Sequence, residues 1–516
     1  MDYDAIVIGA GHNGLTTAAY LSQAGYRVGV FERRDTVGGA IATEEVVPGY
    51  QFDLGGSAHI LVRLTPLVEE LELRRYGLEY IELDPLFSAP APEGPPLYVW
   101  RDPDRTAAGL NEAVPGAGDR YRSFLDDWSQ FAQALKNMFL AEPTPWQLGR
   151  SMLFETTTPL PWSVAARTIS RPYGAVVRQY FEEERVQALL AWMAAQSGPP
   201  PGTALSAPFV LWHPLYHESG VARPRGGSGM LAQALRRHVE SHGGAVHTGA
   251  PVDEILVEGG AATGVRVNDQ VYTARAVCAA THIRETYNHL LPDAHRPPEA
   301  GTLRVGNGFG AMLRLALDAP VEYANAPSKR TRTGLQLLCR SIDQIEQAYG
   351  DFKAGRPAED PPLVAMTFSA ADDTLAPEGG EVLWLWGQYF PYELAGDWTW
   401  DAIGDRVADR LLDAFERYAP GTREKVVGRL FQDPAWLEEH LALPHGNVMH
   451  LEMDLDQMFA ARPSLEHPTY RGPVDGLYLT GASTHPGGGI MGASGRNAAR
   501  VMLRDLSSWV ERVALG

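Results

Sequence analysis

The apolar positions of the first forty residues follow the spacing of a strand, then of a helix, then of a strand again. The run at 5–8 predicts a buried strand, the alanine-rich stretch 16–25 a helix, and 26–31 a second strand. Gly25 stands where a helix stop is expected. The chain therefore opens with a strand–turn–helix–strand unit.

Three glycines lie in the turn between the first strand and the helix. Gly9 permits a tight turn, Gly11 lets a pyrophosphate approach the backbone, and Gly14 lets helix and strand pack closely. The helix N-terminus offers free N–H groups and a partial positive charge. Glu32 ends the second strand, where its carboxylate is placed to accept hydrogen bonds from a ribose diol. Together these features predict a dinucleotide site.

The end of the chain contains a second glycine turn between a strand and a helix. The pattern predicts a strand at 476–481 and a helix at 494–509, with a dense cluster of glycines between them. Such a loop suits close backbone packing against the ring system of a cofactor, with the helix N-terminus facing a ring edge or a phosphate.

Between these ends the pattern predicts mixed helices and short strands. The helix expected at 118–140 has one apolar face, which is typical of core packing. Further helices are expected at 66–73, 223–242 and 400–418, and further strands at 245–248, 252–257, 263–267, 272–279, 309–317 and 382–390.

Composition limits the classes of function. A chain of 516 residues can bury a large core and should hold two or more domains. Its formal charge of −19 disfavours nucleic acid as a partner, and no run of 18 apolar residues predicts a membrane span. Cys278 and Cys339 are far apart, so neither a redox disulfide nor a metal site is expected. With no room for a signal peptide before the first strand, we expect a cytoplasmic protein.

One basic segment stands out in this acidic chain. The stretch 156–181 contains Arg167, Arg171 and Arg178 and no acidic residue, with tryptophans and leucines nearby. Arginines beside large apolar side chains suit a membrane-surface element. An ordinary helical cap over a pocket is an equally good interpretation.

Several motifs resemble those of known flavoproteins. Gly38 and Gly39, just after Glu32, resemble the two-glycine extension of amine oxidases and carotenoid desaturases. With the sequences at 222–231 and 477–501 they are similar to the bacterial phytoene-desaturase-like flavoproteins. The segment 446–470 most resembles the CrtO-type β-carotene ketolases. The resemblance covers nearly the whole length.

This resemblance implies an α/β fold: a Rossmann-like FAD-binding domain with an inserted α+β substrate domain and a helical cap. The FAD-binding domain would comprise 1–80, 220–300 and 445–516. The substrate domain would comprise 81–219 and 301–444, with a membrane-facing helical region near 140–215. The implied FAD contacts are Gly9, Gly11, Gly14, Glu32, Arg33, Gly38, Gly39, Val252, Gly481, Gly488, Gly489, Ile490 and Met491.

The implied activity is 4-ketolation of a β-ionone ring of a carotene, drawn from a membrane that the protein contacts peripherally. Because the cofactor carries the chemistry, few protein groups are needed. His59, His450, Glu452 and His485 are the titratable residues of these motifs that could handle protons. A carotenoid desaturase is the alternative enzyme, and a non-catalytic isoprenoid carrier is a third hypothesis. The sequence does not indicate an oligomeric state.

Overall fold

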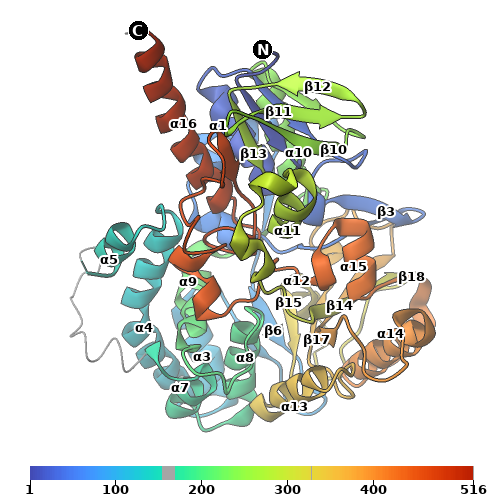
Figure 1. The fold of residues 1–516 in the computed structure, drawn as a ribbon. Coiled ribbons are helices and arrows are strands. Elements are labelled where there is room, and N and C mark those ends of the chain that lie inside the picture. Colours follow the sequence, from blue (N-terminus) through green and yellow to red (C-terminus); the bar gives the residue numbers. More distant parts are fainter. Residues whose placement is uncertain (154–168, 327, 515–516) are drawn as a thin grey trace.

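A computed structural model describes residues 1–153, 169–326 and 328–514 of the chain (Figure 1). Its first sheet contains five parallel strands, which come from both ends of the chain and from its middle. In spatial order they are β19 (Leu477–Leu479), β13 (Ala276–Ala279), β1 (Ala5–Ile8), β2 (Val28–Phe31) and β9 (Ala245–His247).

The two faces of this sheet are covered differently, because successive side chains of a strand point to opposite faces. Ala5 and Val7 face a core formed with α1, α10 and α16. Ile6 and Ile8 face a core formed with a small antiparallel sheet. The elements are α1 (His12–Gln23), α10 (Gly229–Ser241) and α16 (Ala493–Ala514), with β10 (Val252–Glu258), β11 (Ala261–Val267) and β12 (Gln270–Thr273).

The second sheet contains seven strands and is mostly antiparallel; only β6 and β15 pair in parallel. Its two longest strands have no exposed residue, which explains why they read as continuous apolar runs. In spatial order they are β18 (Val426–Gln432), β14 (Gly308–Leu317), β17 (Glu381–Pro391), β16 (Leu363–Met366), β15 (Leu335–Leu338), β6 (Phe87–Ala89) and β7 (Leu97–Val99).

Helices cover both faces of the second sheet. Leu383 and Leu385 pack against α14 (Trp400–Glu416), at the right of Figure 1. Trp384 and Trp386 face the large core on the other side, which we call the helical layer. It contains α3 (Pro103–Ala113), α4 (Ala117–Phe139), α7 (Tyr173–Tyr180), α8 (Glu184–Ala195), α9 (Trp212–Ser219) and α13 (Ile342–Lys353), and α5 (Pro145–Leu153) lies against α4.

Short elements join the two sheets. They are the hairpin of β3 (Thr43–Val47) and β4 (Tyr50–Asp53), the pair β5 (Tyr80–Leu83) and β8 (Val221–Pro224), and α2 (Leu67–Glu70), α11 (Ile283–Glu285), α12 (Lys329–Thr333) and α15 (Pro434–Leu441). A fully buried ion pair links two of them: Arg223 Nη1 lies 2.8 Å from Asp53 Oδ2, and Arg223 Nε lies 3.7 Å from Asp372 Oδ2.

Most predicted elements are present, but several bounds differ. The helix expected at 223–242 begins at Gly229, because Val221–Pro224 is the strand β8, and the strand expected at 272–279 is divided into β12 and β13. The first helix begins at His12, four residues before the expected start, because Gly11 already serves as its N-cap. The single helix expected at 66–73 is two short turns, α2 and a 3₁₀ turn over Leu73–Tyr76. Glu72 between them has a φ of +47°, which no helix continues through.

Candidate functional site: a glycine cradle for a dinucleotide cofactor

The three N-terminal glycines meet three different local demands. Gly9 has a φ of +97°, and its N–H donates to the Phe31 carbonyl, which ties the turn to β2. A Cβ atom on Gly14 would lie 2.2 Å from the Gly9 carbonyl oxygen, so only glycine fits where α1 crosses the strand. A Cβ on Gly11 would meet no atom within 4 Å. The backbone at Gly11 is therefore open to a ligand.

The second glycine pair lies directly against this turn. The Gly38 N–H donates to the Ala10 carbonyl at 2.9 Å, and Gly38 forms a parallel bridge with Gly11. A Cβ on Gly39 would lie 3.4 Å from the Gly11 Cα. The chain therefore passes twice beside the same open position.

Glu32 is buried at the end of β2 and faces the glycine turn. Its Oε2 accepts from the Ala10 N–H at 2.7 Å, and its Oε1 accepts from the Arg34 N–H at 3.0 Å. The Glu32 carbonyl accepts from the Ala250 N–H, which brings the start of β10 and Val252 beside it. Arg33, also predicted to contact the cofactor, is exposed.

The C-terminal glycine loop (481–492) lies against the N-terminal turn. Burial lowers the pKa of His12 to about 4, and a hydrogen bond with the Gly489 backbone partly opposes that effect. Behind the loop, the Gly481 N–H donates to Ser494 Oγ of α16 at 3.0 Å. His12 therefore connects the two glycine segments that the sequence predicts to share one ligand.

Other predicted residues of this loop contact neighbouring segments. A Cβ on Gly488 would lie 2.5 Å from Met449 Sδ, so a larger residue would not fit there. Ile490 packs over Gly56 of the loop that follows β4, and Met491 lines a pocket.

The residues present fit a dinucleotide-containing cofactor. The Gly11 N-cap makes no side-chain hydrogen bond, so the first N–H groups of α1 are available to a pyrophosphate. The open backbone at Gly11 and the carboxylate of Glu32 lie on the two sides of this helix end. These residues would hold the ADP half, and the loop 481–492 would hold the other half.

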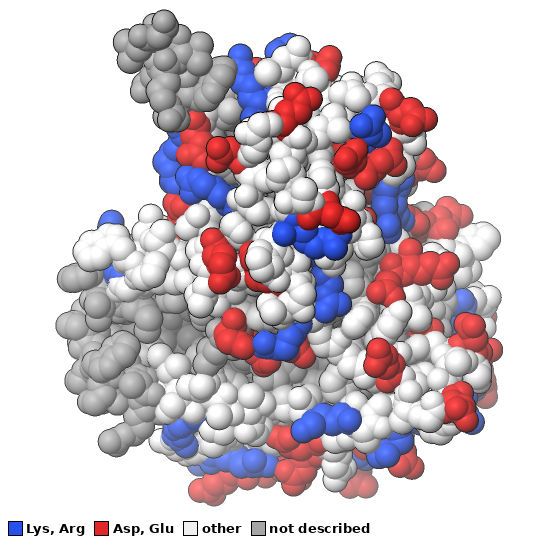
Figure 2. Space-filling model, in the orientation of Figure 1, with Lys and Arg blue, Asp and Glu red and all other residues white. Residues whose placement is uncertain are grey.

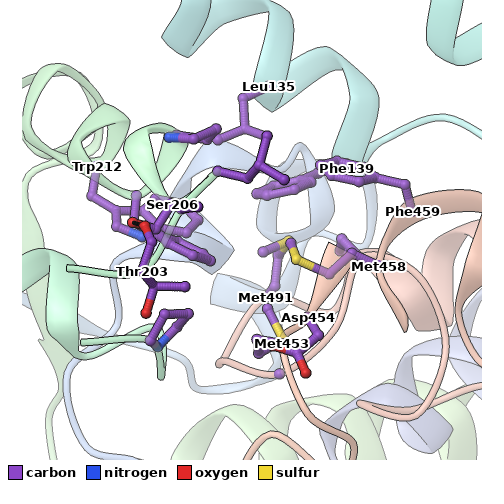
Figure 3. Close-up of a pocket in the computed structure, with 17 residues that line it drawn as sticks. Leu135, Phe139, Thr203, Ser206, Trp212, Met453, Asp454, Met458, Phe459 and Met491 are labelled. Atoms are coloured by element: carbon purple, nitrogen blue, oxygen red, sulfur yellow. Dashed lines mark hydrogen bonds between the residues drawn. The ribbon is translucent and has the colours of Figure 1, made fainter. Parts of the chain in front are cut away.

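An apolar pocket extends from the C-terminal glycine loop between the helical layer and the segment 453–459 (Figure 3). The open space within it is about 730 Å³, solvent at its mouth included. Asp454 is the single charged residue among the described residues of its lining. The lining is Leu135, Phe139, Pro199, Thr203, Ala204, Leu205, Ser206, Pro208, Phe209, Trp212, Met453, Asp454, Met458, Phe459, Pro486, Gly488 and Met491.

A more polar pocket adjoins it and shares Pro199, Thr203, Met453 and Asp454 with it. Aromatic rings and two carboxylates line this second pocket. Its lining includes Phe309, Tyr349, Phe352, Tyr389, Asn307, Asn447, Glu452 and Asp454. The two pockets are therefore neighbours that share part of their walls.

Two of the predicted proton-handling residues are buried histidines on either side of the cradle. His59 Nδ1 lies 2.8 Å from the Tyr80 hydroxyl and its Nε2 lies 2.8 Å from the Ser228 hydroxyl, so both ring nitrogens are engaged within the protein. His485 Nε2 donates to the Met138 carbonyl at 2.9 Å. Burial keeps the pKa of His59 well below its usual value and lowers that of His485 to about 4.

The other two lie on the segment just before Arg462. His450 Nδ1 lies 2.9 Å from Ser483 Oγ, and its ring stacks on His282 with centroids 4.8 Å apart. Glu452 Oε2 accepts from Arg304 Nε at 3.0 Å at the edge of the polar pocket. Of the four, Glu452 is the residue that lines a pocket, whereas His450 lies behind the glycine loop.

The basic segment is only partly described: Arg167 lies outside the described residues. Arg178 forms an ion pair with Asp343 at 2.8 Å, and Arg171 bonds to Gln179 and to the Ala175 carbonyl. On the face shown in Figure 2, basic and acidic side chains are interspersed. No helix in the described part of the chain is long and apolar enough to cross a membrane.

The five-stranded parallel sheet and its glycine cradle define a dinucleotide-binding protein. The model of the family described as flavin containing amine oxidoreductase matches residues 14–503. The chain belongs to this family, and FAD is its cofactor.

Similar proteins span the whole chain. A protein of Mus musculus named pyridine nucleotide-disulfide oxidoreductase domain-containing protein 2 is 33% identical over 98% of this chain and 94% of its own length. A lycopene-forming phytoene desaturase of Pantoea ananas is 28% identical over 97% and 99%. The crystal structure of an oxidoreductase from Methanosarcina mazei matches with a TM-score of 0.64 at 18% identity, over 97% of this chain and 99% of that one, and shows the same fold.

Two residues near the cofactor loop escaped the sequence analysis. His12 occupies a variable position inside the first glycine motif, and Arg462 follows the 3₁₀ turn Phe459–Ala461. His12 could have been found from its position between Gly11 and Gly14, because it is the first residue of the helix whose N-terminus faces the ligand.

Proposed function

We propose that this FAD-dependent oxidoreductase acts on a long apolar carotenoid, and that it introduces a 4-keto group into a β-ionone ring. The observation that carries the proposal is the apolar pocket, because it extends from Gly488 and Met491 of the glycine loop through leucine, phenylalanine, tryptophan and methionine side chains. Such a lining favours a hydrocarbon, and Asp454 is the single charged group among its described residues.

Bound FAD supplies a hydride acceptor for an allylic carbon of the polyene. The chain's own part is to orient the ring end against the glycine loop and to exclude bulk water there. We assign proton handling to Glu452, because it lines the polar pocket through which water would reach the ring. Desaturation is the second candidate, and the similarity to a phytoene desaturase favours it.

Membrane delivery is part of the proposal. Leu205 lines the apolar pocket and is 41% exposed, and Trp146 on α5 is 74% exposed. Exposed large apolar side chains such as these suit contact with a lipid surface. We place the protein in the cytoplasm, peripherally bound to a membrane.

The test incubates the purified flavoprotein with β-carotene, γ-carotene and an acyclic carotene, each in liposomes and in detergent, and identifies products by mass. Oxygen gained at a ring supports ketolation, and loss of hydrogen alone refutes it in favour of desaturation. The variant W146S should lose turnover with liposomes but keep it in detergent. Equal turnover of the variant in both would refute membrane delivery, and turnover of none of the carotenes would refute the substrate class.

A further inference from the structure

Arg462 is a buried cation that forms no ion pair with an acidic residue in the described part of the chain. Its side chain is completely inaccessible, and its donors are used by main-chain oxygens. Nε donates to the Ala482 carbonyl at 3.0 Å, and the two terminal nitrogens donate to the carbonyls of Ala482, Met449, Leu451, Glu452 and Gln457. The guanidinium is therefore satisfied in hydrogen bonding while its charge is not neutralised.

Other buried arginines of the described chain are placed differently. Arg223 contacts Asp53 and Asp372, and the charge of Asp53 also acts on Arg314. For Arg462, burial alone lowers the pKa, to about 9, and no carboxylate opposes that effect. Burying an unpaired charge costs folding free energy, so a buried arginine without an ion pair calls for a partner that compensates its charge.

Arg462 lies directly behind the loop that meets the cofactor. A Cβ built on Gly487 would be 3.5 Å from Arg462 Nε, so the guanidinium packs against the backbone of the loop. The Ala482 carbonyl that it binds belongs to the same loop.

We propose that Arg462 is the fixed positive charge that keeps the reduced isoalloxazine of FAD in its anionic form. The oxidised ring system is neutral. When it takes a hydride, that is two electrons and one proton, it gains one negative charge, and the substrate is left as a cation. A cation held in a low-dielectric site stabilises that anion and disfavours uptake of a second proton.

The other titratable groups around Arg462 are neutral histidines. His282, His450 and His485 all have a pKa lowered mainly by burial and further by the charge of Arg462. The Glu452 carboxylate is held by Arg304 at the polar pocket, with only its carbonyl bound to Arg462. Arg462 contacts the backbone of the loop itself, and Asp454 lines the pocket beside the loop.

The experiment measures the midpoint potential of the bound flavin from pH 6 to pH 8 by dye equilibration. With an anionic reduced flavin, two electrons couple to one proton and the potential falls by about 30 mV per pH unit. We expect that slope in the wild type and in R462K. In R462M, with FAD bound, the slope should steepen toward twice that value within this range, and an unchanged slope would overturn the proposal.

A second variant covers the case in which R462M loses its flavin. Met453 Sδ lies 3.4 Å and Arg462 Nε 3.5 Å from a Cβ built on Gly487, so M453E adds a negative charge beside the loop that opposes the charge of Arg462 while leaving the arginine in place. It should lower the potential by at least about 30 mV, which is tenfold in the reduction equilibrium, while the neutral control M453Q leaves it unchanged. Equal potentials of M453E and M453Q would refute the electrostatic role.

Discussion

Replacing Gly11 or Gly14 by alanine should affect different properties: G14A the stability of the apoprotein, and G11A the affinity for the cofactor. A methyl group on Gly14 would lie 2.2 Å from the Gly9 carbonyl oxygen and 2.9 Å from the Ala280 Cβ. The helix α1 would have to move away from β1, and overpacking of this kind costs about 1–3 kcal/mol. G14A should therefore lower the stability of the apoprotein.

A methyl group on Gly11 has no such cost. Gly11 has a φ of −67° and a ψ of 166°, which alanine adopts without strain, and its Cβ would enter open space. The apoprotein stability of G11A should stay within about 0.5 kcal/mol of wild type. The methyl group would, however, stand where the pyrophosphate approaches, so FAD affinity should fall at least tenfold, or about 1.4 kcal/mol.

Urea unfolding of the apoproteins and titration with FAD, followed by flavin fluorescence, separate the two effects. Gly109 is exposed on α3 and a Cβ there meets nothing, so G109A is the matched control and should keep wild-type FAD affinity. If G11A bound FAD as tightly as wild type, the assignment of the pyrophosphate to this turn would be wrong. If G14A and G11A unfolded at the same urea concentration, the packing argument would fail.

Two further predictions concern buried charge. Burial lowers the pKa of His213 to about 4, so on acidification the unfolded state binds a proton at a higher pH than the folded state does. The stability that comes from keeping His213 neutral is complete above about pH 6.5 and is lost as the pH falls toward 4. H213F should flatten urea stability against pH in that window by up to about 1.4 kcal/mol per pH unit, and an unchanged slope would show that His213 does not titrate there. R223M leaves Asp53 without its cation and should cost about 3–5 kcal/mol in urea unfolding, whereas R178M removes only the exposed pair with Asp343 and should cost less than about 1 kcal/mol; similar losses would contradict the burial argument.

The glycine positions of the cradle were predictable because each one answers a local demand. A positive φ at Gly9, an open backbone at Gly11 and a close crossing at Gly14 all follow from the short strand–turn–helix segment itself. The long strands β14 and β17 were predictable for a similar reason, since both faces of their sheet are covered.

The roles of the histidines and of Arg462 depend on partners far along the chain. The sequence suggested His59 as a proton carrier, but its ring is held by Tyr80 and by Ser228, which is 169 positions away. Arg462 gained its importance only when the fold brought Ala482 and Met449 around it. No periodicity or local motif predicts these contacts, because they depend on how distant segments of the chain pack together.

The order of strands in the first sheet has a consequence for how the protein is made. β1 and β2 leave the ribosome first, whereas β13 pairs with β1 from the middle of the chain and β19 and α16 are synthesised last. At about 5–20 residues per second, the nascent βαβ unit waits for a time of the order of a minute before Gly489 can reach His12. One edge of β1 has no strand beside it until β13 is made, and β13 then lacks a neighbour until β19 is made; exposed edges invite wrong pairing. Flavin loading is therefore a step that follows completion of the chain, and a nascent protein truncated before β19 should emerge colourless.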